Sequence, residues 1–171
     1  MARVLVRALA VLFQVGCGSE AAPSGPPVAR PEPGRPVRPT ADEGVPPLDP
    51  SDPLDAEMLR RVALFAPNMI AATPMQRGRL STGESQDFQA VLQAGHCFRI
   101  VAVGGQGVTD LDLFLFDPAG VQVQQDTAVD AYPVLGLNAP ICPERAGAYR
   151  VQVRMFAGAG EFGVQVYRTP G

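Results

Sequence analysis

Hydrophobic residues follow two different periods along this chain, and the change of period divides it into a helical and a β-rich part. Between residues 53 and 66 they recur every three or four positions, which is the spacing of one face of an α-helix. After residue 76 they alternate with polar residues, as in strands with one buried and one solvated face. The pattern therefore predicts a helical segment at 53–76 and a β domain at 77–171.

The predicted helix begins at Asp52 and Pro53, because aspartate is a favoured capping residue and proline suits the first helical position. Its apolar stripe consists of Leu54, Met58, Val62 and Phe65. Pro67 ends the pattern. A membrane-surface helix has a broader basic face than this one, so we expect the stripe to pack on the β domain.

The alternating rows of the β part are separated by short turns rich in glycine and proline. The clearest row runs from Tyr149 to Met155, and we expect its apolar members to face inward and its arginines outward. A turn is predicted at Gly158–Gly160, between this row and the next, Phe162–Val166. Half-buried strands joined in this way predict an all-β fold, an antiparallel sandwich or barrel of about seven or eight strands.

Composition separates the N-terminal third from the rest. Glycine and proline each supply 18 of the 171 residues, and the prolines are dense in residues 17–52. With few bulky apolar side chains, this segment cannot offset the entropy cost of ordering, and its prolines favour an extended form. We interpret it as a disordered Pro-rich linker that holds the domain away from a membrane, with a passive low-complexity tail as the alternative.

The first 16 residues have the pattern of an export signal. Arg3 and Arg7 precede a short apolar run that ends at Phe13 and cannot span a bilayer. Gly16 and Cys17 resemble a bacterial lipobox, in which the cysteine is acylated and becomes the new N-terminus. We therefore predict a signal peptide at 1–16 and a membrane-anchored lipoprotein of the bacterial cell envelope, lipidated at Cys17. An ordinary cleaved signal is the alternative.

Cys97 and Cys142 then remain as an even pair, which in an exported chain predicts a disulfide. The competing interpretation is a nucleophile or metal site with His96. Neighbouring side chains of an extended strand point to opposite faces, which disfavours that site. His96 is the only histidine, so a multi-histidine zinc site is not available, and we expect it at a solvated strand start.

Aspartates gather in one stretch of the β part that contains no basic residue. They are Asp110, Asp112, Asp117, Asp126 and Asp130. Asp110 and Asp112 project from the same face of a strand, and with Asp126, Asp130 and loop carbonyls they could supply the six to eight oxygens that calcium takes. The alternative is structural, with Asp112 paired to an arginine such as Arg150.

Two segments resemble the bacterial pre-peptidase C-terminal (PPC) domain. Thr109–Gly120 has that family's Asp-hydrophobic-Asp-Leu strand and Asp-Pro-x-Gly turn, and Ala146–Val153 has its Ala-Gly-x-Tyr strand opening. The resemblance covers roughly residues 77–168 and implies a jelly-roll-like β-sandwich. Family members accompany secreted enzymes and surface proteins; some bind matrix proteins or polysaccharide, and some are calcium-stabilised. Cys97 and Cys142 depart from the family pattern.

The residues that carry chemistry are few, and we predict that the protein is not an enzyme. We expect a non-catalytic, envelope-tethered binding or structural module that recognises a surface protein or a glycan, with calcium as the one candidate cofactor. A secreted hydrolase without a recognisable signature is the alternative. A net charge of -3 disfavours nucleic acid as a partner. Three tyrosines and eight phenylalanines, most of them expected in the core, favour a protein over a glycan.

Overall fold

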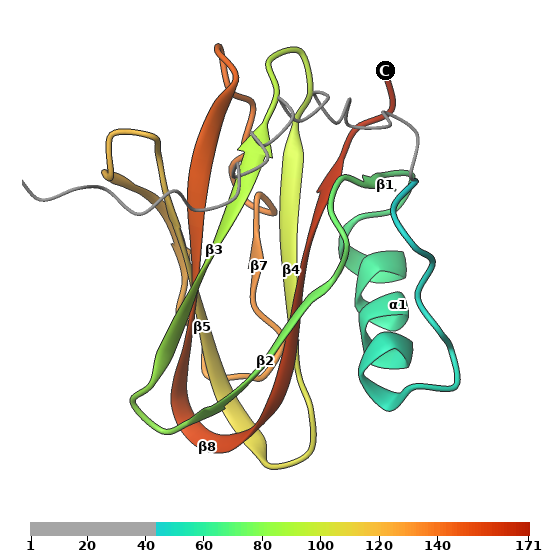
Figure 1. Cartoon of the computed structure of the whole chain (residues 1–171), viewed down its shortest axis with the longest axis vertical. Helices are drawn as coiled ribbons and strands as arrows, with labels where there is room; N and C mark the ends of the chain where they lie inside the picture. The colour runs from blue at the N-terminus through green and yellow to red at the C-terminus, as the bar shows by residue number, and fades with distance from the viewer. Residues whose placement is uncertain (1–43) are drawn as a thin grey trace, which may run out of the picture. The chain divides into compact units, whose positions relative to one another are not determined.

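The computed structural model describes residues 44–171; the predicted signal peptide, Cys17 and most of the linker lie outside these residues. It contains one helix, α1 (Pro53–Phe65), and eight strands that pair in antiparallel fashion (Figure 1). The strands are β1 (Ile70–Ala71), β2 (Gln76–Ser81), β3 (Ser85–Leu92), β4 (Phe98–Gly104), β5 (Val108–Phe116), β6 (Gln122–Asp126), β7 (Val134–Leu135) and β8 (Gly147–Arg168). The predicted all-β, antiparallel fold with one short helix is confirmed. In residues 44–171, no helix has the length and apolar character needed to cross a membrane.

The two sheets share one long strand, β8. Its first part pairs with β3 and β5, and β5 pairs in turn with β6; we call this sheet B. Its second part pairs with β1, β2 and β4, and β4 pairs with β7; we call this sheet A. Because β8 is continuous through both sheets, the domain is a β-sandwich that approaches a barrel (Figure 1).

The predicted turn at Gly158–Gly160 is wrong, because β8 continues through these residues. Gly158 has a φ of 96°, and the register with β5 shifts next to it. A Cβ atom at Gly158 would lie 2.3 Å from the carbonyl oxygen of Gly107, so only glycine fits this close approach. The glycines therefore bend one strand from sheet B into sheet A, where the sequence suggested a reversal between two strands.

The core between the sheets is built from the predicted alternating rows. Leu111, Leu113 and Val153 of sheet B and Ile100 and Phe162 of sheet A are fully buried there. Each such side chain contributes about 1.5–3 kcal/mol relative to an exposed one. The period-two pattern thus identifies the interior correctly along β4, β5 and β8, whereas the alternating valines Val121 and Val123 near β6 are exposed.

Helix α1 covers the outer face of sheet A. Its stripe residues Leu54 and Met58 are buried against Val101, Val103 and Tyr167, which confirms the packing predicted for the helix.

The chain ahead of the helix packs on the same cluster. Leu48 is half-buried against it, and the backbone N–H of Asp49 donates to the Asp55 carboxylate at 2.9 Å. The folded unit therefore includes residues before Pro53, within the segment that the sequence assigns to the linker.

Candidate functional site

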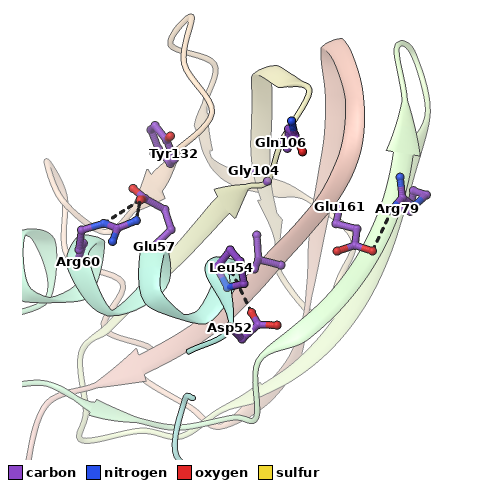
Figure 2. A pocket seen from close by; sticks show the side chains of 11 residues that line it. Asp52, Leu54, Glu57, Arg60, Arg79, Gly104, Gln106, Tyr132 and Glu161 are labelled. Atoms are coloured by element: carbon purple, nitrogen blue, oxygen red, sulfur yellow. Dashed lines mark hydrogen bonds and ion pairs between the residues drawn. The ribbon is translucent and has the colours of Figure 1, made fainter. Parts of the chain in front are cut away.

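An open cleft lies where the start of α1 meets the sheets, and we call it the α1 cleft (Figure 2). It has a volume of about 560 Å³. Its walls come from the first turns of α1, from β2 and β8, from the turn between β4 and β5, and from Tyr132. Five segments that are distant in the sequence therefore meet in one cleft.

The helix start fixes the first carboxylate of the cleft. Oδ1 of Asp52 accepts the backbone N–H groups of Leu54 and Asp55, at 3.0 and 2.9 Å, and so caps the helix. The Arg77 guanidinium binds Asp52 at 2.8 Å and Asp55 at 2.5 Å. The hydrogen bond from Arg77, together with that from the Asp55 N–H, lowers the pKa of Asp52 to about 2. Asp52 is therefore an anion under ordinary conditions.

One turn further along α1, Glu57 is held by two arginines. It accepts from Arg60, and from Arg61 at 2.6 Å. Burial acts to raise the pKa of Glu57, but the hydrogen bonds from the two arginines outweigh it and lower that pKa. The Arg61 guanidinium also lies 3.5 Å from the centroid of the Tyr132 ring, so one face of this ring is already covered.

The opposite wall carries a cross-strand ion pair. Arg79 of β2 lies directly opposite Glu161 of β8, and their side chains meet at 2.9 Å (Figure 2). Both side chains are well exposed, at 71% for Arg79 and 59% for Glu161. Such pairs are weak in water, and each partner remains open to other charged groups.

The Gly-rich turn between β4 and β5 closes the end of the cleft. The Gly105 N–H donates to the carbonyl oxygen of Glu161 at 2.8 Å, which places the turn against β8. A Cβ atom on Gly105 would lie only 3.2 Å from the same oxygen, so a larger residue would push the turn away. This Gly-rich turn therefore shapes the cleft.

Two carboxylates of the cleft are poorly suited to acid catalysis. Asp52 and Glu57 have lowered pKa values, so neither is prepared to donate a proton as a general acid. His96 lies just before β4, at the end opposite the β4–β5 turn, where its Nδ1 is 3.1 Å from the carbonyl oxygen of Thr169. The one histidine is therefore engaged away from the cleft.

The predicted disulfide is present. Cys97 and Cys142 are joined by an S–S bond of 2.00 Å, with their Cα atoms 4.2 Å apart. The bond ties the chain just before β4 to the loop ahead of β8, and neither cysteine lines the α1 cleft. The disulfide therefore links two segments of the fold and has a structural role.

The structure does not gather all four predicted calcium ligands. Asp126 accepts the backbone N–H groups of Ala128 and Val134, and Asp130 accepts that of Tyr132, so both carboxylates are occupied in shaping the loop. Across residues 44–171, no three side chains of histidine, cysteine, aspartate or glutamate are placed to hold a metal ion.

Asp110 and Asp112 form a separate pair on the outer face of β5, and both are buried. Burial, with the neighbouring Asp110 charge, raises the pKa of Asp112. Arg150, the predicted partner of Asp112, instead binds Asp87 at 3.1 Å. The residue opposite Asp112 on β8 is Arg154, which comes no closer than 4 Å to a carboxylate of the described chain.

The expectation that most aromatic side chains lie in the core is confirmed for the described residues. Phe98, Phe162 and Tyr167 are buried, and Phe65, Phe88, Tyr132 and Tyr149 pack against the core clusters. Phe114 and Phe116 are exceptions, because they alternate with core leucines and therefore lie on the outer face of sheet B. Phe156 of the same sheet is largely exposed. The period of two assigns these phenylalanines to the outside, although their hydrophobicity suggests the opposite.

Comparison with known proteins identifies no family for this chain. No family model matches the sequence, and no curated protein matches it. A solved structure that resembles it is the Aeromonas hydrophila PliG, described as a periplasmic lysozyme inhibitor of g-type lysozyme. The TM-score is 0.41 with 14% identity, over 58% of this chain and 88% of that chain. The likeness is too low to support an argument about function, and the resemblance to the PPC domain stays a prediction.

Sequence reasoning does not find the α1 cleft. Arg79 and Glu161 are 82 positions apart, and no local motif links them. Of the cleft residues, only Asp52 and Pro53 have a recognisable sequence pattern. That pattern predicts where the helix begins, but it does not predict which residues the helix start contacts. The cleft depends on the bend of β8, which brings the helix, β2 and the β4–β5 turn together.

Proposed function

We propose that this protein is an exported, non-catalytic binding module that recognises a charged segment of a surface protein in the α1 cleft. The observation that carries the proposal is the state of the three cleft carboxylates, Asp52, Glu57 and Glu161, each of which is held by an arginine. A site built from paired, ionised groups of both signs is suited to binding other charged groups.

The exposed pair of Arg79 and Glu161, together with the exposed Arg60 of the pair on α1, gives the cleft its capacity to bind. Solvent-exposed ion pairs contribute about 0–1 kcal/mol, so a partner's charged side chains can replace one member at little cost. The pair on α1 and the pair on β2 and β8 lie on opposite walls (Figure 2). A partner segment that presents both signs of charge would therefore meet a complement on each wall, which favours orientation and specificity.

A glycan fits this cleft less well. Sugars commonly stack on open aromatic rings, and the aromatic ring that lines the cleft, Tyr132, has one face covered by Arg61. The phenylalanines on the outer face of sheet B lie outside the cleft lining. These contacts support a protein partner over a glycan.

The hydrolase alternative has no support from the cleft. Glycoside hydrolysis uses one carboxylic acid with a raised pKa, whereas Asp52 and Glu57 have lowered values. Acyl transfer uses a nucleophile with a base in reach, and no serine, cysteine or histidine lines this cleft.

Export and anchoring complete the proposal. The disulfide between Cys97 and Cys142 is typical of an oxidising compartment, which supports export. We propose that the signal at 1–16 directs it, that Cys17 carries a lipid, and that the Pro-rich linker spaces the domain from the membrane. Intact-mass measurement of the native protein should show the added lipid, and Cys17→Ser should release the chain from membranes. An unmodified Cys17 would disprove the anchor.

A photo-crosslinking residue in place of Gln106 tests the binding proposal directly, because Gln106 lines the cleft. The matched control replaces Gln93, an exposed residue between β3 and β4, at the opposite end of β4 from the cleft. We expect an envelope protein to crosslink through position 106 and not through position 93, and Arg79→Glu to abolish that product. Equal crosslinking at both positions, or a product that survives Arg79→Glu, would reject the cleft as the binding site.

A further inference from the structure

Strand β3 forms a long free edge of sheet B. Its eight residues pair with β8 without a register shift, and within residues 44–171 it pairs with no other strand. The other edge strands are shorter: β2 has six residues, β6 has five and a register shift opposite β5, and β1 and β7 have two each. Proteins commonly blunt an edge with a short strand, a bulge or a proline, and β3 has none of these.

Alternate residues of β3 direct their backbone hydrogen-bonding groups away from the sheet. The Met155 N–H donates to the carbonyl oxygen of Glu84 at 2.9 Å, which sets the phase of the ladder where β3 begins. In an antiparallel pair, residues bonded to the neighbouring strand alternate with residues whose groups point the other way. The continuous register therefore directs the N–H and C=O groups of Asp87, Gln89 and Val91 away from β8. No turn or loop of the described chain bonds to these groups.

An apolar groove lies beside this edge, where the two sheets separate. β2 and β3 follow each other in the chain but pair with different parts of β8, so no backbone pairing closes the sandwich between them (Figure 1). The groove has a volume of about 190 Å³, and its lining includes Phe88 and Ala90 of β3 and the core residues Val151, Val164 and Val166. Pockets for drug-sized ligands measure about 300–1,000 Å³, so this groove suits single side chains.

We propose that β3 binds an extended segment of a partner protein, which adds a strand to sheet B. The backbone of the segment bonds to the free groups of β3, and every second side chain enters the groove. The segment is therefore free of proline where it pairs, with apolar side chains at alternate positions. Its binding also covers Val91, which is 66% exposed beside the edge. This surface goes beyond the α1 cleft, with which it shares no lining residue.

Two other occupants fit the edge less well. The longest proline-free stretches of the linker at 17–52 have six residues, and proline cannot donate to a ladder. A second copy can pair through its own β3, but the inward side chains Ala90 and Leu92 of that strand are only 4% and 0% exposed. Because they are held in their own core, they cannot enter the groove of another copy. A separate extended segment satisfies both the edge and the groove.

The first test measures amide hydrogen exchange in the full chain by NMR. The probe is a synthetic nine-residue peptide of alternating threonine and valine with an arginine at each end. The amides of Asp87, Gln89 and Val91 should exchange rapidly in the free protein and at least roughly tenfold more slowly with saturating peptide. Those of Phe88 and Ala90, which bond to β8, are the control and should be slow in both states. Rapid exchange of the first three amides with peptide would overturn the proposal. Slow exchange of these amides without peptide would also overturn it, because the linker or a second copy would then occupy the edge.

A pair of variants tests the groove. Gln76 is exposed and lines it, so Gln76→Glu places a charge where the apolar side chains of the segment enter. This variant should weaken peptide binding roughly tenfold, measured by fluorescence anisotropy of labelled peptide. The matched control is Gln122→Glu, at an exposed position of β6, the opposite edge strand of sheet B. It should bind as the wild type does. Equal effects of the two substitutions would refute the groove as the binding site.

Discussion

Two groups of carboxylates in this domain show opposite solutions to the same electrostatic problem. In the α1 cleft, Asp52, Glu57 and Glu161 are held by arginines. On the outer face of β5, Asp110 and Asp112 are buried and have no positive partner in the described chain within 4 Å. The first group is balanced by the protein's own arginines, and the second group is not.

The two sites differ in what their charges contribute to the free energy of unfolding, whatever the shape of each site. An ion pair at the surface contributes little free energy. A charged group of a binding partner can therefore replace one member of the pair at low cost. Unpaired buried groups reduce the stability of the protein, so whatever neutralises them also stabilises the fold. Substitution of a single charge should therefore change stability in opposite directions at the two sites.

The largest effect is expected at β5. Asp110→Asn in calcium-free buffer should raise the free energy of unfolding by about 2 kcal/mol, because it removes a buried charge with an unpartnered oxygen. Urea denaturation at neutral pH measures this change. A lower stability for the variant would mean that Asp110 gains more from its surroundings than the structure indicates.

A smaller effect of opposite sign is expected for Arg77→Met, which leaves Asp52 and Asp55 without their guanidinium partner. The loss should be about 1 kcal/mol, since Arg77 is 40% exposed and solvent screens the pair. Arg79→Met is the matched control, because Arg79 is more exposed and binds a single exposed glutamate. An equal loss of stability in Arg77→Met and Arg79→Met would show that the contacts of Arg77 with the helix start add no stability beyond that of an exposed ion pair.

The smallest effect is expected in the acid range, at Asp52. Its folded-state pKa is about 2 against an ordinary value of 3.8, so its ionised form adds stability above 3.8 that is lost as the pH falls through about 2. Asp52→Asn keeps a capping oxygen but does not titrate. The stability difference between wild type and variant should therefore shrink across this range in acid titrations of both proteins. If the difference in the free energy of unfolding stayed constant with pH, another group than Asp52 would cause the acid-range loss of stability.

Local signals explain how much of the fold could be predicted from the sequence. Asp52 and Pro53 set the helix start, the Tyr149–Met155 row identifies a buried strand face, and the even count of Cys97 and Cys142 gives the disulfide. Each of these depends on neighbours in the chain or on a simple count, so no knowledge of the three-dimensional arrangement is needed.

The wrong predictions concern positions where the local sequence fits two structures equally well and only the tertiary structure decides between them. Gly158 serves a tight turn and a strand bend equally well, because both need a positive φ. Arg150 and Arg154 lie on the same face of β8, and only the register with β5 shows that Asp112 faces Arg154. The α1 cleft has the same origin, since its charged walls come from β2, β8 and the helix.

The sharing of β8 between the sheets has a consequence for how the chain folds. Gly147–Arg168 is the final strand in chain order, yet β1, β2, β3, β4 and β5 all pair with it. Neither sheet can form its central ladder until these residues are available, so a partly synthesised chain has no stable β structure to adopt. Folding must therefore wait for β8, and the pairings with this strand are then made at long sequence separation, which is slow.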